Sequence, residues 1–392
     1  MSLRVLHLNS LLRGGGTDDQ CVKLAAGLRT LGIDAMVAGP DEREFSWTVR
    51  KLGVPMFATP PEGFLKLRLI REVAEFIRTK KIHVIHSHHG RDIWPTILAA
   101  RWSGVRPKVV LTRHLAKSPA SWFSRRFMLN RCDAVIAVSD FVARVLREGV
   151  YQPGAYIPER RVRPRIRGDL RRIHVIPGGI DTTRFRPGAA EELRAQWRLQ
   201  PGHFAFAAVG AYDLPHGKGQ RVFLRAAAKI HRQIPDARFL IVGRGSMAPA
   251  LESEIIRSDL EHKAWLTPYC QDMPAAMNAI DCLVHAQVGT EAFGAVVIEA
   301  FACGRPVIAS SLDGIPEAFA VGGVGTLVRP RSSDELAAAM LAWARRPRLT
   351  EAERQALHAR VSRDYSLTAY ARRVAALYEH LLPVPDPDET AS

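Results

Sequence analysis

Two glutamates in the second half of the chain, Glu291 and Glu299, lie around the predicted start of a helix. They fall in GTEAFGAVVIEAFACG, residues 289–304, where the helix is expected to begin near Gly294 or Ala295. Free backbone N–H groups and the dipole at a helix start attract a diphosphate. A carboxylate beside a diphosphate is tolerated where it accepts hydrogen bonds from sugar hydroxyls. By position, Glu291 is expected to meet a transferred sugar and Glu299 a ribose; the alternative is two ordinary surface acids.

Two cations follow other predicted strands in the same half. Lys218 lies in the segment GKG, where the next helix opens, and Arg244 lies in GRGS, residues 243–246. Ligands bind at the carboxyl edge of open α/β sheets, so both side chains are placed to reach a phosphate there. Each is also compatible with an ordinary surface cation.

Glycines and histidines end strands in the first half. The segment RGGGTD, residues 13–18, offers a flexible backbone that could close over a phosphate. Its spacing does not match G-x-G-x-x-G, and no acidic residue ends a second strand about 20 residues on, so a nicotinamide site is disfavoured. Histidines follow at positions 86, 88 and 89 and at His114. H-x-H at a strand end is poor support for a metal. We favour His114 as a partner of a sugar, the alternative being a core or loop histidine.

These residues need a scaffold that brings strand ends together. Short runs rich in Val and Ile alternate with segments of helical period, the pattern of a parallel sheet with crossover helices. Strands are predicted at residues 4–9, 35–39, 84–86, 109–112 and 134–138, and again at 205–209, 238–242, 264–266, 282–285 and 306–309. The fold class is therefore α/β, with two doubly wound units.

The boundary between the units is predicted near residues 176–187, IPGGIDTTRFRP, where Gly and Pro interrupt the chain. We expect a first domain of residues 1–178 and a second of residues 179–365. A helix at residues 366–382 is expected to pack back on the first domain, and the Pro-rich acidic tail at 383–392 to be disordered.

Composition is that of a folded protein of two domains, with 392 residues of which 47% are hydrophobic and 24% charged. The five cysteines are odd in number and widely spaced, which favours free thiols in a reducing compartment. A signal-peptide pattern is not found, nor about 18 uncharged apolar residues in a row. The protein is therefore expected to be cytoplasmic, soluble or peripheral on a membrane.

The net charge of +16 and the pI of about 10.1 favour polyanionic partners. Nucleic acid, anionic lipid and phosphorylated glycan are the candidates. Nucleic-acid binding would give the two-domain pattern and the glutamates no role, and no aromatic residues interleave the Arg-rich run at 158–172. No nucleic acid is therefore expected as a partner.

In order along the chain, eight segments resemble those of the retaining glycosyltransferases of family 4, which have the GT-B fold. They are RGGGTDDQCVKLAAGLRTLG, HVIHSHH, LTRHL, DAVIAVSDFV, HVIPGGIDTTRF, the GKG segment, FLIVGRGS, and E-x7-E followed by GRPVIAS and DGIPEAF. The resemblance covers nearly the whole sequence. It implies two Rossmann-like domains facing across a cleft, with the acceptor on the first and a nucleotide diphosphate sugar on the second.

The resemblance also implies roles for individual residues. Gly15 and Gly16 would close on the donor phosphates, and His114 would contact the donor sugar near the reacting carbon. Lys218 would neutralise the leaving diphosphate. Backbone N–H groups of Phe293 and Gly294 would bind the same diphosphate.

In this resemblance Glu291 would hold sugar hydroxyls and Glu299 the ribose. No metal and no cofactor are expected, since basic side chains and the helix start replace a metal. The nucleotide of the donor, UDP, GDP or ADP, stays open.

The chain departs from the family pattern at two places. The family often has an arginine where this chain has Ala211, so the second phosphate contact is expected from His216 or Arg244. A basic insert at residues 151–172 is longer than the usual link at that place.

The predicted activity is retaining transfer of a sugar to a hydroxyl of a glycan or lipid-linked acceptor, by front-face attack. The sequence looks similar to enzymes of lipopolysaccharide core or other cell-surface glycan biosynthesis. A sugar phosphorylase and a nucleotide-sugar epimerase on the same fold are the alternatives.

Basic segments of the first half also predict docking on an anionic membrane surface. The helix predicted at residues 64–81 has an apolar stripe bordered by Lys and Arg, although such a stripe also suits a crossover helix that packs on the sheet. The proposed membrane or acceptor contacts are Trp122, Arg125, Arg126, Arg160, Arg161 and Arg163.

Overall fold

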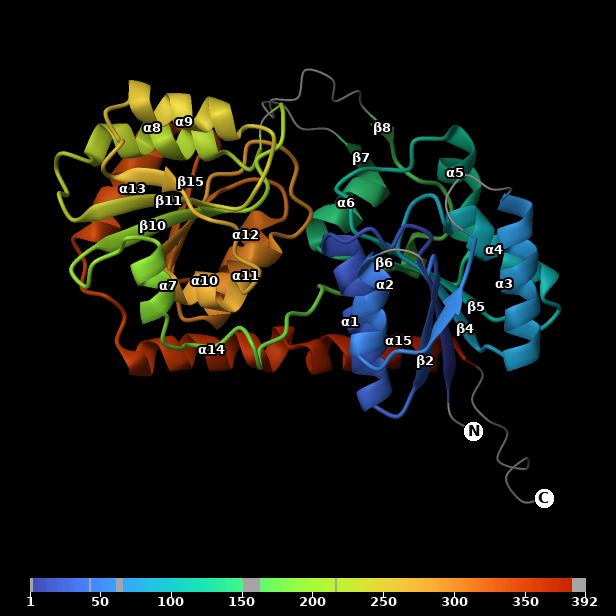
Figure 1. Cartoon of the computed structure of the whole chain (residues 1–392). Coiled ribbons are helices and arrows are strands. Elements are labelled where there is room, and N and C mark those ends of the chain that lie inside the picture. The colour runs from blue at the N-terminus through green and yellow to red at the C-terminus, as the bar shows by residue number, and fades with distance from the viewer. Residues whose placement is uncertain (1–2, 42–43, 61–65, 151–162, 216, 383–392) are drawn as a thin grey trace. The chain divides into compact units, whose positions relative to one another are not determined.

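The computed structural model describes residues 3–41, 44–60, 66–150, 163–215 and 217–382 (Figure 1). Within these residues the chain forms two compact units. The first comprises the chain up to residue 150, residues 163–179 and residues 367–382, and the second comprises residues 180–366. The tail at 383–392, for which disorder was predicted, lies outside the described residues.

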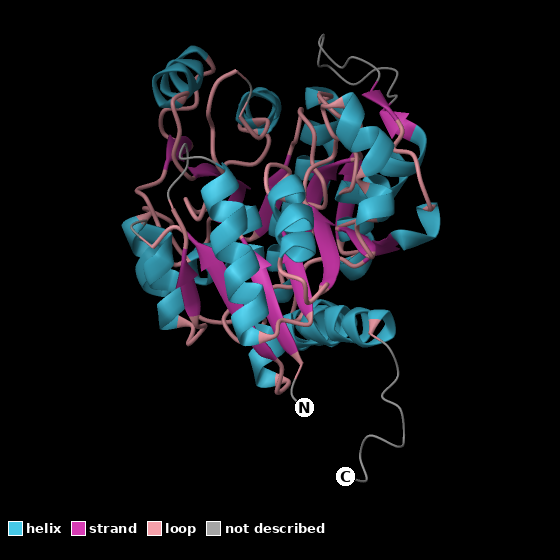
Figure 2. Ribbon diagram, turned by 90° about the vertical axis from the view of Figure 1, so that its right-hand side faces the viewer, coloured by secondary structure: helices cyan, strands magenta, loops and turns pink. Residues whose placement is uncertain are grey.

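The first unit is built on a parallel sheet of seven strands in the order β3-β2-β1-β4-β5-β6-β9. These strands are β1 (Arg4–Leu8), β2 (Asp34–Gly39), β3 (Met56–Ala58), β4 (Val84–Ser87), β5 (Lys108–Arg113), β6 (Ala134–Ala137) and β9 (Ile173–Val175). Helices lie along the strands and cover the sheet (Figure 2). Because both faces are covered, the central strands are nearly continuous apolar runs, which is why they were recognisable in the sequence.

The helices of the first unit are α1 (Gly16–Thr30), α2 (Glu44–Lys51), α3 (Lys66–Lys80), α4 (Ile93–Trp102), α5 (Trp122–Phe127), α6 (Asp140–Glu148) and α15 (Leu367–Leu381). A short antiparallel pair joins β7 (Gly149–Val150), which ends just before the basic insert, to β8 (Arg163–Pro164), which opens the described part of that insert.

Helix α15 packs on α1, so the end of the chain completes the first unit. Tyr370, Val374 and Tyr378 are fully buried in the same core cluster as Leu24 and Leu28 of α1. A Cβ atom on Gly27 would lie 3.0 Å from the Cβ of Ala371, so this glycine allows the two helices to approach closely. The short side chains at the crossing thus fix where α15 lies.

The apolar stripe of α3 is not a membrane-binding face, which corrects part of the docking prediction. Ile70, Val73, Ala74 and Ile77 are buried, and only Leu67 at the helix start is exposed. The stripe packs inward, as a crossover helix requires. Among the described residues, no helix is both long and apolar enough to span a bilayer.

The second unit has a parallel sheet of six strands in the order β12-β11-β10-β13-β14-β15. Its strands are β10 (Phe204–Val209), β11 (Ala237–Val242), β12 (Ala264–Leu266), β13 (Cys282–His285), β14 (Val307–Ser310) and β15 (Gly325–Val328). Its helices are α7 (Glu191–Gln196), α8 (Gln220–Ile230), α9 (Ala248–Arg257), α10 (Met273–Ala279), α11 (Ala295–Ala302), α12 (Ile315–Gly322), α13 (Ser333–Ala344) and α14 (Glu351–Tyr365).

The strand order of the second sheet reverses between β10 and β13. In such a sheet the loops that follow the two central strands diverge to opposite faces, and ligands bind in the crevice outside their carboxyl ends. The ten strands predicted from the sequence are all present, with ends that differ by at most a residue or so. The short strands β3, β9 and β15 were not predicted.

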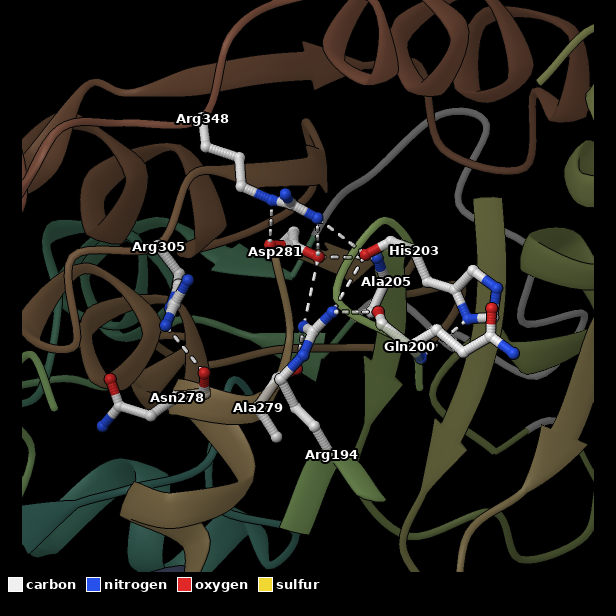
Figure 3. Close-up of polar contacts among 9 residues, drawn as sticks. All are labelled: Arg194, Gln200, His203, Ala205, Asn278, Ala279, Asp281, Arg305 and Arg348. Carbon is white, nitrogen blue, oxygen red and sulfur yellow. Dashed lines mark hydrogen bonds and ion pairs between the residues drawn. The ribbon is translucent and has the colours of Figure 1, made fainter. Parts of the chain in front are cut away.

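The opposite, amino edge of the second sheet is held by a buried carboxylate. Asp281 precedes β13, and its side chain is 5% exposed. Its oxygens accept hydrogen bonds from Arg348 Nε at 2.8 Å, from Arg194 Nη1 at 3.3 Å and from the Ala205 backbone N–H at 2.8 Å (Figure 3). Both guanidinium groups also donate to the His203 carbonyl. One acid thereby connects β10, β13 and the residues before α14.

We predict that Asp281→Asn destabilises the protein by about 2 to 4 kcal/mol, because the substitution leaves two partly buried arginines without their counter-charge. The matched control is Asp334→Asn, which removes an 86% exposed carboxylate paired with Lys229 and should cost no more than about 0.5 kcal/mol. Urea denaturation followed by circular dichroism measures both. Equal stabilities of the two variants would contradict the structural role given to Asp281.

Candidate functional site

An ion pair at the carboxyl edge of the second sheet joins the loops that follow β10 and β13. Lys218 Nζ lies 2.7 Å from Glu291 Oε2, and His285 Nε2 lies 3.8 Å from the same oxygen. The sequence placed Lys218 and Glu291 near one ligand, and the structure brings the two side chains together. His285, the last residue of β13, was not singled out, since a lone histidine in a strand carries no signal of its own.

A glycine lets the two loops meet. Gly219, which precedes α8, has a φ of +88°, and a Cβ atom built on it would lie 1.8 Å from the Ala286 carbonyl oxygen. Any other residue would therefore push α8 away from the end of β13. Lys218 is positioned by this close approach.

Glu291 lies at the start of α11, which begins at Ala295 as predicted. Gly294 precedes the helix with a φ of +85° and offers no side-chain cap. Burial alone would raise the pKa of Glu291, but Lys218, His285 and a hydrogen bond from the Gly294 N–H hold it below its usual value. Burial lowers the pKa of His285 to about 4. At neutral pH the site therefore combines a carboxylate, an ammonium and a neutral imidazole.

The other two residues predicted around α11 lie just before the helix and in its middle. Phe293 is buried, and its ring stacks on that of Tyr365 with centroids 6.1 Å apart. Glu299 is half-buried in the middle of α11. Phe293 thus anchors the loop that carries Glu291, and its side chain serves packing.

The loops after β10 and β11 are joined by their backbones. A Cβ atom on Gly243 would lie 2.3 Å from the Gly210 carbonyl oxygen, and Tyr212 Oη donates to the Gly243 carbonyl at 3.0 Å. Arg244 is exposed, with its guanidinium 4.9 Å from the centre of the Tyr269 ring. The other predicted substitute for the arginine missing at position 211, His216, lies outside the described residues.

A cavity of about 210 Å³ adjoins the same loops, and the sequence reasoning missed its cations. It is lined by Gly219 and Val288 together with three arginines, Arg221, Arg225 and Arg331. Arg331 Nη2 donates to the Val288 carbonyl at 3.5 Å. The arginines come from α8 and from the loop after β15, and their convergence depends on a strand that was not predicted.

In the first unit, a buried carboxylate shapes the glycine loop between β1 and α1. Asp18 accepts hydrogen bonds from the backbone N–H groups of Arg13 and Gly14, both at 3.0 Å, and from Asn9 Nδ2 at 2.8 Å. His89 Nε2 lies 2.7 Å from Asp18 Oδ1, the oxygen that also accepts from Asn9. Burial raises the pKa of Asp18, but the bonds from His89, Asn9 and Arg13 outweigh it and lower the pKa overall.

This loop leaves a helix start open. Gly15 precedes α1 with a φ of +108° and makes no side-chain cap, and Cβ atoms on Gly15 or Gly16 would meet nothing within 4 Å. The first N–H groups of a helix have no carbonyl partner within it. Among the described residues, the backbone N–H groups of these predicted phosphate-binding glycines have no partner, while Asp18, absent from the prediction, fixes the conformation of their loop.

Four histidines gather at the carboxyl ends of β1, β4 and β5. His88 Nε2 lies 3.0 Å from His7 Nδ1, and His88 Nδ1 lies 3.3 Å from Nε2 of the half-buried His114. His86 hydrogen-bonds Tyr378 Oη and Thr112 Oγ1, both at 2.6 Å. His7, the last residue but one of β1, escaped the sequence reasoning. The nitrogens of His7, His86 and His88 lie within 4.8 Å of one another, but hydrogen bonds already engage each ring.

The predicted membrane contacts differ in how exposed their side chains are and in whether other groups of the protein bind them. Trp122 and Phe123 on α5 are 66% and 49% exposed. Arg126 lies 5.1 Å from the Phe127 ring, whereas Arg125 is engaged by the carbonyls of the loop before α5. Arg160 and Arg161 lie outside the described residues, and Arg163 begins β8.

Comparison with solved structures agrees with this architecture. A glycosyltransferase from Rickettsia africae is 20% identical and superposes with a TM-score of 0.80 over 97% of this chain and 98% of that one. Anabaena HepE, solved in complex with UDP and glucose, is 22% identical with a TM-score of 0.75, over 96% of this chain and all of that one. At this identity the likeness establishes the GT-B fold.

Sequence relatives establish the family. Residues 14–158 match the family described as Glycosyltransferase Family 4, and residues 203–346 match Glycosyl transferases group 1. A D-inositol 3-phosphate glycosyltransferase of Rhodococcus erythropolis is 34% identical over 79% of this chain and 72% of that protein. A lipopolysaccharide core biosynthesis mannosyltransferase of Rhizobium meliloti is 25% identical over 97% of this chain and 98% of that protein. The chain is therefore a glycosyltransferase with the GT-B fold and belongs to glycosyltransferase family 4.

Proposed function

We propose that the enzyme transfers a sugar from a nucleotide diphosphate sugar with retention of configuration at the anomeric carbon. The observation that carries the proposal is the Lys218–Glu291 pair at the start of α11. A cation and the N–H groups of a helix start together suit a diphosphate, and a carboxylate beside them suits sugar hydroxyls. The complexes of Anabaena HepE with UDP and with UDP-glucose support a donor of this kind.

Donor binding would exchange partners at this site. In the free enzyme Glu291 and Lys218 neutralise each other, and Glu291 also receives the Gly294 N–H. The diphosphate would take over Lys218 and the N–H groups of Phe293 and Gly294, which frees the Glu291 carboxylate for the transferred sugar. Glu299 would bind the ribose, and Gly15 and Gly16 would donate to the donor phosphates.

The reaction requires stabilisation of developing negative charge on the leaving diphosphate. The acceptor oxygen bonds to the anomeric carbon, the bond from that carbon to the diphosphate oxygen breaks, and the hydroxyl proton passes to the leaving phosphate oxygen. Lys218 and the start of α11 stabilise the charge. His114 hydrogen-bonds the donor sugar. The proposal uses no side-chain nucleophile, no metal and no cofactor.

The acceptor proposed is a hydroxyl of a glycan or lipid-linked sugar in the biosynthesis of lipopolysaccharide core or another cell-surface glycan. The Rhizobium relative, which aligns over nearly the full length of both chains, supports this assignment. Incubation with donor and inorganic phosphate alone separates transfer from phosphorolysis, since a transferase releases no sugar phosphate. Neither epimerisation nor phosphorolysis of the donor is expected.

Glu299→Ala should abolish most of the affinity for the free nucleotide diphosphate, whereas Glu291→Ala should retain that affinity and lose transfer. UDP, GDP and ADP are first screened by thermal shift, because a ligand at 100 times its Kd stabilises by about 2.7 kcal/mol. Calorimetry with the nucleotide that binds then compares the variants. Glu252→Ala, on the exposed face of α9, is the control. Unchanged nucleotide affinity in Glu299→Ala would refute the ribose assignment.

Lys218→Ala should lower turnover about 100- to 1,000-fold, the usual cost of losing a preorganised charge contact to a leaving group. Lys229→Ala removes a lysine of α8, the helix that follows Lys218; this lysine pairs with Asp334, and the variant should keep full turnover. Steady-state kinetics with the donor identified above measures both variants. Near-normal turnover in Lys218→Ala would mean that another cation, such as Arg331, holds the leaving phosphate.

We also propose that the protein is cytoplasmic and docks peripherally on an anionic membrane through exposed α5 aromatics and the basic insert. Each basic residue near such a surface contributes about 1 kcal/mol, and 1 M salt shortens screening to about 3 Å. Flotation with anionic liposomes should therefore succeed at low salt and fail at high salt. The test variant carries Ser at Arg160, Arg161, Arg163, Arg165 and Arg167 and should not float.

A charge-matched control carries Ser at five exposed arginines of the second unit, Arg198, Arg232, Arg257, Arg346 and Arg363. It should float like the wild type. If the two variants float equally, the insert is not the membrane contact and net charge alone governs binding.

A further inference from the structure

Three imidazoles of the first unit form a single hydrogen-bonded row from the core to the sheet edge. His7 lies within β1, His88 follows β4, and His114 follows β5. His7 Nδ1 and His88 Nε2 are 3.0 Å apart, and His88 Nδ1 and His114 Nε2 are 3.3 Å apart. His7 and His114 each use one ring nitrogen in this row, and His88 uses both of its nitrogens.

All three rings are neutral at physiological pH. Burial lowers the pKa of His7 and of His114 to about 3 and lowers that of His88 well below its usual value. A neutral imidazole has one N–H and one bare nitrogen. The protons of the row must therefore all point the same way, either outward from His7 or inward from His114, which leaves two possible arrangements.

The inner end of the row selects between these arrangements. His7 Nε2 is fully buried and has no hydrogen-bond partner among the described residues. Buried N–H groups without an acceptor are rarer in proteins than buried acceptors without a donor. The proton of His7 is therefore on Nδ1 and is donated to His88. His88 then donates from Nδ1 to Nε2 of His114, whose own proton must be on Nδ1.

We propose that His88 and His7 are positioning residues that hold His114 as the Nδ1–H tautomer, so that it presents a hydrogen-bond donor to the sugar. The assignment of a sugar contact to His114 rests on the proposed function. Among the described residues, no hydrogen bond engages His114 Nδ1, so this atom is available to a ligand. A neutral N–H donor would bind a sugar oxygen and would not add positive charge beside the anomeric carbon.

The neighbouring histidines do not belong to the row. His86 stacks on His88 with ring centroids 4.3 Å apart, but its nitrogens face Tyr378 and Thr112. His89 binds Asp18. The row therefore ends at His7, and the orientation of its protons depends on His7 and His88 alone.

The test reads the tautomer directly and needs no substrate. The full-length protein is labelled with ¹⁵N-histidine, and two-bond ¹⁵N–¹H spectra assign the protonated nitrogen of each ring; the His114 signals are those lost in His114→Gln. We expect Nδ1–H for His114 in the wild type. His88→Phe, which cannot donate, should shift His114 toward the Nε2–H form. His88→Asn, whose amide nitrogen can replace Nδ1 as the donor, should restore Nδ1–H.

Kinetics then tests the consequence. His88→Phe should lower kcat about 10- to 100-fold, the usual cost of removing a hydrogen-bond partner that orients a metal-bound histidine. The affinity for the nucleotide diphosphate should stay within about twofold of the wild type. His88→Asn should recover most of the loss. His86→Gln is the control for perturbation of the histidine cluster and should leave both the His114 tautomer and kcat unchanged. Melting temperatures identify any variant that fails to fold. The pair His7→Asn and His7→Phe repeats the comparison at the histidine that precedes His88 in the row.

Two spectroscopic results overturn the proposal. One is an Nε2–H tautomer of His114 in the wild type, and the other is an Nδ1–H tautomer that survives in His88→Phe. A near-stoichiometric metal in the purified protein, ligated by His7, His86 and His88, would also replace the hydrogen-bonded row. If the proposed sugar transfer itself is wrong, the wild type shows no turnover, and the tautomer spectra still decide the present proposal.

Discussion

The second unit depends on how closely two loops can approach at the reversal point of its sheet. The loops after β10 and β13 meet where the Ala286 carbonyl faces the α carbon of Gly219, and no side chain fits between them. That contact sets the start of α8 and directs Lys218 toward Glu291. The charged groups of the site are therefore positioned by backbone packing, which is stiffer than a pair of surface side chains could be.

The first unit differs from the second, because it buries polar side chains at the carboxyl edge of its sheet. Asp18 is satisfied by two backbone N–H groups and two side chains, so a buried charge is tolerated. His7, His86, His88 and His114 remain neutral and hydrogen-bond one another, Thr112 and Tyr378, which leaves His7 Nε2 as a buried atom without a partner among the described residues. Tyr378 belongs to α15, so the last helix of the chain contributes to the polar core as well as to its apolar part.

Local patterns predicted much of this structure and could not predict the contacts that depend on distant residues. The central strands were found because both of their faces are covered, whereas β15 escaped because Gly325 and Thr326 interrupt its apolar run. The start of α11 followed from Gly294, but the pairing of Glu291 with Lys218 joins two loops 73 residues apart. His7 looked like an ordinary strand residue, and only the pairing of β1 with β4 sets it opposite His86 and within 3.0 Å of His88. The apolar stripe of α3 was compatible in sequence with membrane docking and with packing on the sheet, and the burial of its side chains shows that it packs on the sheet.

The acid that holds the second sheet together lies at its amino edge, whereas the charged pair lies at the carboxyl edge. Asp281 and Glu291 flank the same strand, β13, so that strand is clamped at one end and carries the proposed site at the other. Loops at the carboxyl edge can consequently accept insertions and altered residues, because the contacts of Asp281 at the other edge maintain the free energy of unfolding. Such a division makes the unit evolvable, because a new donor or acceptor preference can arise by drift in the loops without a compensating change in the scaffold.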